Sequence, residues 1–151
     1  MSEIIVKKAE YSDVPQIAEI EMNCIPQPWS EAAFAEALED EKAVTLAAFC
    51  GGILCGFITG VYLLDMADIY SCAVSAEYRK KGVGKRLLEE FFSALPDGVN
   101  SVGLEVRENN IPAIKLYEKT GFERVGLRKD FYREPRENAV LMTKILNKRL
   151  P

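Results

Sequence analysis

The chain has 151 residues, of which 48% are hydrophobic and 28% are charged, and its formal net charge is −4. This composition is typical of one soluble globular domain, which we place at residues 2–148, and it excludes a disordered or membrane-embedded protein. The negative charge argues against sequence-independent binding to nucleic acid, so we expect no nucleic-acid partner. Histidine is absent, which excludes Ser-His-Asp and Cys-His catalysis and imidazole-based zinc sites, and we expect no metal.

The cysteines and the first residues of the chain bear on its compartment. The four cysteines (Cys24, Cys50, Cys55 and Cys72) form no C-x-x-C pair, which favours free thiols packed in a reduced protein. Residues 1–8 lack the order of a signal peptide, and no apolar run reaches a membrane-spanning length. We therefore expect a cytoplasmic protein with no membrane partner.

The N-terminal half predicts a strand, two helices and three further strands. Residues 4–9 form the first strand, and a helix headed by Asp13 ends before Pro26 and Pro28. Its expected inner face is Val14, Ile17, Ala18 and Ile25. Ser30 is the expected N-cap of the second helix, which carries Phe34 and Leu38 on one face and acidic residues on the other. Residues 44–50 and 53–64 form a hairpin around Gly51-Gly52, and residues 66–74 form the next strand.

The C-terminal half predicts two helices that alternate with strands. Apolar residues recur at helical spacing from Val83 to Leu95, and Pro96-Asp97-Gly98 ends that helix. Residues 101–107 alternate as a strand, and a helix capped by Asn110 ends at Gly121. Residues 122–132 and 139–145 are two final strands. This order indicates a mixed α/β sheet with helices on both faces.

The segment Arg79-Lys80-Lys81-Gly82-Val83-Gly84-Lys85 lies between a strand and a helix. Residues 79–86 hold five basic side chains and no acidic one, in a chain that is acidic overall. Two glycines at the start of a helix let a ligand approach the unpaired N–H groups of the first turn, which favours a phosphate or pyrophosphate. The spacing fits neither a P-loop nor a dinucleotide-binding fingerprint. A solvated turn remains the alternative.

Together with downstream motifs, this segment resembles the GNAT superfamily of acetyl-CoA-dependent N-acetyltransferases. The matching stretches are Ala73-Val74, residues 79–84, Leu104-Glu105-Val106-Arg107, residues 110–122, and Phe131-Tyr132 through Ala139. With Pro28-Trp29-Ser30, they are most similar to the RimI-type bacterial enzymes, which acetylate the N-terminal alanine of a small-subunit ribosomal protein. The resemblance implies one mixed, mostly antiparallel sheet of about seven strands flanked by four helices.

The chemistry of acetyl transfer to an amine needs a base for the ammonium proton and an acid for the leaving thiolate. An α-amino group titrates near ~7.7–8.0 and a lysine near ~10.4, so one carboxylate can assist the former without strong tuning. The resemblance implies that Glu105 is the general base and Tyr117 the general acid. The alternatives are a charged residue on the solvated face of a sheet for Glu105 and a packed core aromatic for Tyr117.

The same resemblance implies the residues that bind the cosubstrate acetyl-CoA and the acceptor. The pyrophosphate falls to Arg79, Lys80, Lys81, Gly82, Val83, Gly84 and Lys85, and the thioester and pantetheine to the backbone of Cys72, Ala73 and Val74. Asn110 caps its helix and contacts the cofactor, and Phe131 and Tyr132 hold the substrate N-terminus. An oxyanion donor would be the N–H of Val74.

Some features leave the acceptor open. Asn138 stands where the subfamily more often has an acidic residue, and Trp29 either lines the acceptor groove or anchors a loop. An acetyl-cysteine route through Cys72 lacks an evident activating base. The sequence therefore predicts direct transfer to the α-amine of an N-terminal Ala or Ser. Transfer to a lysine or small-molecule amine, and a non-catalytic acyl-CoA-binding module, are the alternatives.

Overall fold

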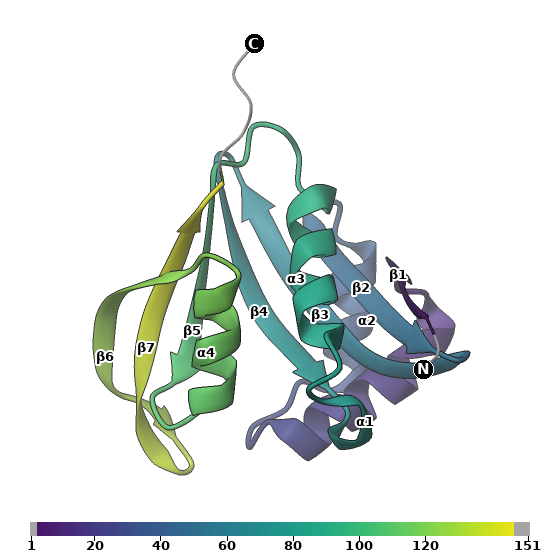
Figure 1. Ribbon diagram of the computed structural model, residues 1–151, viewed down its shortest axis with the longest axis horizontal. Helices are drawn as coiled ribbons and strands as arrows, with labels where there is room; N and C mark the ends of the chain where they lie inside the picture. Colours follow the sequence, from purple (N-terminus) through teal and green to yellow (C-terminus); the bar gives the residue numbers. More distant parts are fainter. Residues whose placement is uncertain (1–2, 147–151) are drawn as a thin grey trace.

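The structure is a computed structural model, and it describes residues 3–146. Seven strands form one sheet in the order β1-β2-β3-β4-β5-β7-β6 (Figure 1). The strands are β1 (Ile4–Lys8), β2 (Ala43–Cys50), β3 (Ile53–Leu63), β4 (Met66–Val74), β5 (Ser101–Arg107), β6 (Glu123–Arg133) and β7 (Arg136–Ile145). The helices are α1 (Val14–Cys24), α2 (Glu31–Glu39), α3 (Val83–Ala94) and α4 (Ile111–Lys119), with short 3-10 turns η1 (Tyr11–Asp13) and η2 (Ala76–Tyr78). The expected seven-stranded mixed sheet with four helices is confirmed.

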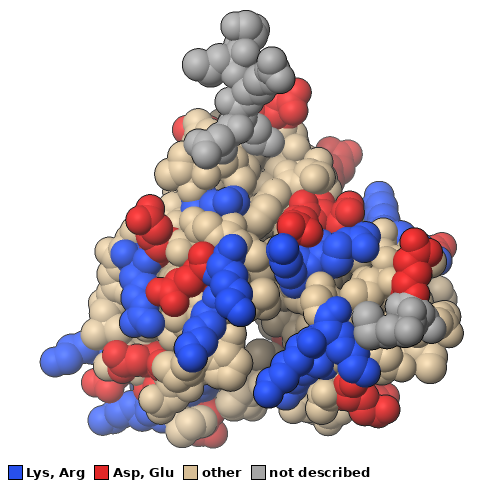
Figure 2. Space-filling view, viewed as in Figure 1, with Lys and Arg blue, Asp and Glu red and all other residues tan. Residues whose placement is uncertain are grey.

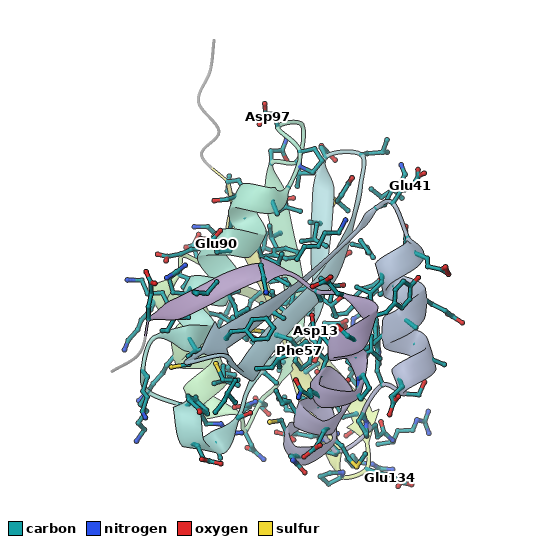
Figure 3. All side chains as sticks on the ribbon, turned by 90° about the vertical axis from the view of Figure 1, so that its right-hand side faces the viewer. Asp13, Glu41, Phe57, Glu90, Asp97 and Glu134 are labelled. Carbon is teal, nitrogen blue, oxygen red and sulfur yellow. The ribbon has the colours of Figure 1, made fainter. Side chains whose placement is uncertain are left out.

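The helices cover both faces of the sheet and bury a separate core on each (Figure 1). On one face, Val83, Leu87 and Phe91 of α3 and Ile114 of α4 pack on the strands. On the other, α1 and α2 pack over Phe57, which is fully buried in the middle of the molecule (Figure 3). Neighbouring strand residues belong to opposite cores because successive side chains of a strand point to opposite faces.

Local chemistry explains where several elements begin and turn. Gly51 and Gly52 have φ values of 61° and 80°, the conformation that a tight two-residue hairpin requires and that glycine adopts without strain. The side chains of Ser30 and Asn110 accept hydrogen bonds from the N–H groups of Ala33 and Ala113, which confirms both predicted N-caps. Gly121, with φ 104°, lies directly after the C-cap of α4.

Several predicted boundaries differ by one residue, and two differences change what the prediction said about a residue. Helix α1 ends at Cys24, and Ile25 is extended with φ −120°, so it is not on the inner face of that helix. Strand β7 begins at Arg136, three residues before the predicted start, because residues 136–138 extend the antiparallel hairpin with β6. The sequence signal was weak there since Arg136, Glu137 and Asn138 are polar.

Strands β4 and β5 are parallel but pair over a short length. Their register covers only the three pairs Met66↔Ser101, Ala67↔Val102 and Asp68↔Gly103. Beyond Asp68 the two strands diverge toward their carboxyl ends, so the sheet opens between its two halves (Figure 1). Helices α3 and α4 lie on the same face, one on each side of this opening (Figure 1).

Across residues 3–146, no helix is long and apolar enough to cross a lipid bilayer.

Candidate active site

A cavity of about 340 Å³ lies where the two halves of the sheet diverge. Its walls come from the segment between α1 and α2, from β4, from β5 and from β6. The lining residues are Trp29, Ile69, Tyr70, Glu105, Phe131 and Tyr132. The fold thus brings Glu105 together with both aromatic residues expected to hold the substrate.

Glu105 occupies the position on β5 that the sequence alternation predicts. Its neighbours Leu104 and Val106 are buried, and its own side chain is 39% exposed. The carboxylate lies 3.7 Å from the guanidinium of Arg128 on β6. Glu105 is therefore a solvated strand residue that also lines the cavity, and its role as a general base stays a prediction.

Tyr117 is buried on α4, and its ring packs edge-on against Phe122 at 5.7 Å between centroids. Burial raises the pKa of its phenol well above the ordinary value, and the neighbouring Cys72 and Tyr132 add to that effect. The hydroxyl is therefore held in its protonated form. Tyr117 does not line this cavity, and Cys72 and Tyr132 lie near enough for their charges to act on its phenol.

Cys72, on β4, is a protonated thiol at neutral pH. Desolvation by the surrounding protein raises its pKa to about 12. Only a thiolate is an effective nucleophile, so this environment disfavours an acetyl-cysteine step. The thiol instead joins the hydrophobic residues that pack against the larger core.

The open edge of β4 directs backbone groups toward the gap between the two halves. The N–H of Ser75 donates to the carbonyl of Cys55 on β3, at 2.8 Å. Because alternate residues of an antiparallel strand point their N–H groups to opposite edges, the N–H groups of Cys72 and Val74 point away from β3. Pairing between β4 and β5 ends at Asp68, so the Val74 N–H faces an edge without a strand partner. This geometry suits a donor to a ligand carbonyl.

The two glycines before and within α3 serve different purposes. Gly82 is the N-cap of α3 with φ 89°, and a Cβ added there would meet nothing within 4 Å. Its surroundings are open, so a ligand can approach the first turn. A Cβ added at Gly84 would lie 2.8 Å from Cδ2 of Leu116, so this glycine lets α3 and α4 pack closely. That both glycines allow a ligand to approach stays a prediction.

The basic residues of the segment point in several directions. Arg79 turns back toward the sheet, where its Nε donates to the carbonyl of Val74 at 3.1 Å and its Nη2 contacts Sγ of Cys24 at 3.1 Å. Lys80 has φ 63°, and Nζ of Lys81 lies 5.6 Å from the ring centre of Tyr78. The side chain of Val83 is buried in the core, which leaves only its backbone for a ligand.

Lys and Arg side chains gather on the face that α3 and α4 cover, several of them around a hollow between the two helices (Figure 2). The exposed members of the predicted segment are Arg79, Lys80, Lys81 and Lys85. A concentration of positive charge beside an open helix start suits an anionic ligand such as a pyrophosphate.

Phe131 and Tyr132 form an aromatic pair at the end of β6, with ring centroids 5.1 Å apart. The guanidinium of Arg107 lies 4.2 Å from the centre of the Tyr132 ring, and that of Arg128 lies 5.5 Å from the Phe131 ring. Burial raises the pKa of the Tyr132 phenol, and the charge of Glu105 contributes in the same direction. Each ring of this aromatic pair therefore contacts an arginine side chain.

Asn110 and Asn138 have structural partners in the same region. Oδ1 of Asn110 accepts from the N–H of Ala113 at 3.3 Å, as a helix cap. Asn138 accepts from the N–H of Asp130 at 2.9 Å and donates to the carboxylate of Glu108 at 3.1 Å. It therefore fastens the irregular part of β6, where Asp130 has φ 52°, to the end of β5.

The sequence analysis missed some residues of the cavity wall. Tyr70 is 54% exposed in the middle of β4, and an aromatic on the outward side of a strand was the available signal. Ile69 carried no such signal. Trp29, for which a loop anchor and a cavity wall were both open, borders this cavity and a neighbouring one of about 370 Å³.

Comparison with known proteins places these observations in a family. The model of the acetyltransferase (GNAT) family matches residues 14–122. The chain is 33% identical over 140 residues to the [ribosomal protein bS18]-alanine N-acetyltransferase of Escherichia coli K12. The alignment covers 91% of this chain and 94% of that protein.

Solved structures agree with the sequence match. The crystal structure of the ribosomal-protein-S18-alanine N-acetyltransferase from Escherichia coli superposes with a TM-score of 0.87 at 30% identity, covering 98% of this chain and 97% of that one. Arabidopsis thaliana NAA60 in complex with acetyl-CoA shares the fold, with a TM-score of 0.85 at 23% identity over 96% of this chain and 99% of that one. The chain therefore belongs to the acetyltransferase (GNAT) family and is an acetyl-CoA-dependent N-acetyltransferase.

Proposed function

We propose that residues 2–148 form one cytoplasmic catalytic domain that acetylates the α-amine of a protein N-terminus beginning with Ala or Ser. The observation that carries this proposal is the cavity in which Glu105 faces Phe131 and Tyr132. The similarity to [ribosomal protein bS18]-alanine N-acetyltransferases supports a small-subunit ribosomal protein of that kind as the acceptor. The net charge of −4 supports a protein acceptor rather than a nucleic acid.

On the acceptor side, Glu105 is the proposed general base. An α-ammonium with a pKa near ~7.7–8.0 loses its proton at neutral pH at a cost of about 1 kcal/mol, which a single carboxylate can offset. The 39% exposure of the side chain leaves room for a water molecule between the amine and the carboxylate. Phe131 and Tyr132 would hold the first residue of the acceptor against this group.

On the donor side, acetyl-CoA supplies the thioester whose acetyl group is transferred. The residues proposed to bind it are the backbone of Cys72, Ala73 and Val74, the segment from Arg79 through Lys80, Lys81, Gly82, Val83 and Gly84 to Lys85, and Asn110. The N–H of Val74 would donate to the thioester carbonyl oxygen, because it faces the open edge of β4. Tyr117, held protonated by burial, would supply the proton for the leaving sulfur.

The side chain of Arg79 supports a narrower role than direct pyrophosphate binding. Its hydrogen bond to the Val74 carbonyl fixes the end of β4 next to the proposed oxyanion donor. The open approach to Gly82 and the start of α3 fit a pyrophosphate at the backbone N–H groups. The main-chain N–H groups at the start of α3 and the exposed lysines Lys80, Lys81 and Lys85 would then bind the pyrophosphate.

The experiment is a measurement of thiol release from acetyl-CoA with short peptides that begin with Ala, Ser, Met or Gly. A peptide with a blocked N-terminus and one internal lysine, and spermidine, complete the set. We expect turnover with the Ala- and Ser-led peptides and mass-spectrometric placement of the acetyl group on the α-nitrogen.

The other outcomes distinguish the alternatives. Turnover only with lysine or spermidine would keep the family chemistry and contradict the α-amine acceptor. Binding of coenzyme A without thiol release from any amine would contradict catalysis on all these acceptors. An Ala-led peptide whose α-amine is blocked is the matched control, and it is expected to be inactive.

A further inference from the structure

Glu21 is a buried acidic residue on the inner face of α1. It follows Val14, Ile17 and Ala18 at helical spacing, in a position where an apolar residue is expected, and it is only 2% exposed. No lysine or arginine in residues 3–146 forms an ion pair with it. Burial of a carboxylate without a counter-ion is costly unless hydrogen bonds satisfy it, so its partners identify its role.

The two oxygens of Glu21 connect two different walls of the acceptor cavity. Oε2 accepts a hydrogen bond from the backbone N–H of Trp29 at 2.8 Å. Oε1 accepts a hydrogen bond from the hydroxyl of Ser71 on β4. The main-chain carbonyl of Glu21 also accepts from the N–H of Ile25 at 2.8 Å.

These links hold a segment that has no regular secondary structure. Residues 25–30 join α1 to α2 and contain Pro26 and Pro28. The indole of Trp29 packs edge-on against Tyr70, with ring centroids 5.7 Å apart, and in a tilted arrangement against Phe34 at 5.3 Å. Tyr70 is the chain neighbour of Ser71, so the Glu21 carboxylate connects the Trp29 segment to the part of β4 that carries Tyr70.

A carboxylate has the right acceptor set for this connection. The Trp29 N–H can only donate, and the Ser71 hydroxyl donates to the second oxygen. An apolar side chain of similar size would leave the Trp29 N–H without its partner and the segment without its link to β4. Glutamine can keep both contacts if its oxygen faces Trp29 and its amide donates to the Ser71 oxygen.

We propose that Glu21 is a positioning residue for the acceptor: it fixes Trp29 against β4 and thereby sets the width of the cavity that receives the substrate N-terminus. This inference rests on the proposed function for the identity of the acceptor. Glu21 acts through Trp29 and Tyr70, and it contacts neither substrate.

The test uses the fact that Trp29 is the one tryptophan of the chain. Its fluorescence emission and its quenching by acrylamide therefore report directly on the segment. Glu21→Ala is expected to shift the emission to longer wavelength, increase quenching and raise the acceptor KM about tenfold. The kcat and the affinity for acetyl-CoA are expected to stay within about twofold, since neither hydrogen bond of the Glu21 carboxylate is to a residue proposed to bind acetyl-CoA.

Three further variants make the test specific. Glu21→Gln is expected to stay close to wild type in emission and in acceptor KM. Ser71→Ala removes one of the two links, and we expect an acceptor KM between those of wild type and Glu21→Ala. Glu19→Gln, on the exposed side of the same helix, is the matched control and is expected to change neither quantity.

The results that overturn the proposal are distinct from failure of the proposed function. Wild-type emission and acceptor KM in a cooperatively folded Glu21→Ala would overturn it. If Glu21→Ala does not fold, an unchanged acceptor KM in Ser71→Ala would overturn it. If no α-amine is turned over by the wild type, the proposed function fails, and with it the role toward the acceptor. The fluorescence then still decides whether Glu21 fixes Trp29.

Discussion

Replacing Arg107 by methionine is expected to destabilise the hairpin that forms one wall of the acceptor cavity. Arg107 is at the end of β5, and its Nη1 donates to the Pro135 carbonyl at 2.8 Å and pairs with Glu137 at 3.1 Å. Its guanidinium also lies 4.2 Å from the centre of the Tyr132 ring. Methionine keeps the length and packing of the stem and removes the charge and the donors.

The structure sets the expected magnitude. The side chains of Arg107 and Glu137 are 15% and 11% exposed, so they form a largely buried ion pair, and removing one partner of such a pair costs about 3–5 kcal/mol. Glu137 keeps its hydrogen bond from the N–H of Asn109 at 2.5 Å, which limits the loss. The cation–π contact with Tyr132 adds about 0.5–2 kcal/mol. We expect a free energy of unfolding lower by about 3.5 kcal/mol, at the low end of the sum.

Urea unfolding of Arg107→Met, Glu137→Gln and the double variant measures the coupling energy between Arg107 and Glu137. The double variant is expected to lose at least about 1 kcal/mol less than the sum of the single losses. Arg124→Met breaks an ion pair with Glu118 whose side chains are 54% and 47% exposed, and this control is expected to change stability by at most about 0.5 kcal/mol. A coupling below about 0.3 kcal/mol would refute the buried ion pair. Because Tyr132 lines the cavity, folded Arg107→Met is also expected to have a raised acceptor KM.

Four other perturbations test the donor side, the acceptor side and the packing of α3 against α4. Glu105→Gln is expected to lower kcat/KM for an Ala-led peptide about 100-fold at pH 7 and about tenfold at pH 9, because the amine is mostly neutral at the higher pH; equal losses at both pH values would exclude the base role. Cys72, with a pKa of about 12, is expected to be alkylated at pH 8 about a thousandfold more slowly in the native protein than after unfolding. Mass spectrometry measures the alkylation rate, and rapid alkylation of the native protein would contradict this expectation. Cys72→Ala is expected to keep the turnover of the wild type. Gly82→Ala is expected to cost about 1–2 kcal/mol of stability through its positive φ and to weaken acetyl-CoA binding. Gly84→Ala is expected to destabilise the protein because its added methyl group would collide with Leu116, and a second substitution, Leu116→Val, should restore part of the lost stability. Calorimetry measures the stability of both variants. If the double variant is no more stable than Gly84→Ala alone, the contact with Leu116 is not the cause.

The regular elements were predictable because their signals are local. The spacing of Val83, Leu87 and Phe91 puts apolar side chains on one side of a helix, and the structure buries all three. The hairpin glycines and the Ser30 and Asn110 caps depend on backbone conformation and on contacts a few residues away. The start of β7 was mispredicted since polar residues 136–138 pair only because β6 lies beside them.

The candidate site was predictable only where a family motif marked it. The motif residues Glu105, Phe131 and Tyr132 line the cavity together, whereas Tyr117 is buried on α4 and is not among its lining residues. Ile69 and Tyr70 belong to no motif, and their place depends on the divergence of β4 from β5 after three residue pairs. That divergence is a property of the whole sheet, so no local pattern encodes it.

Local sequence patterns predicted most of the helices and strands, the basic segment before α3 and the likeness to the GNAT superfamily, since periodicity, turn residues and motif spacing are short-range properties. The tertiary structure decided which residues face one another: Glu21 with Trp29 and Ser71, and Arg107 with Glu137 and Tyr132. It also separated the two glycines of the segment into one open to a ligand and one required for helix packing. The physical reason is that buried hydrogen bonds and close packing join residues that are distant in the chain, and their partners exist only when both halves of the sheet are folded.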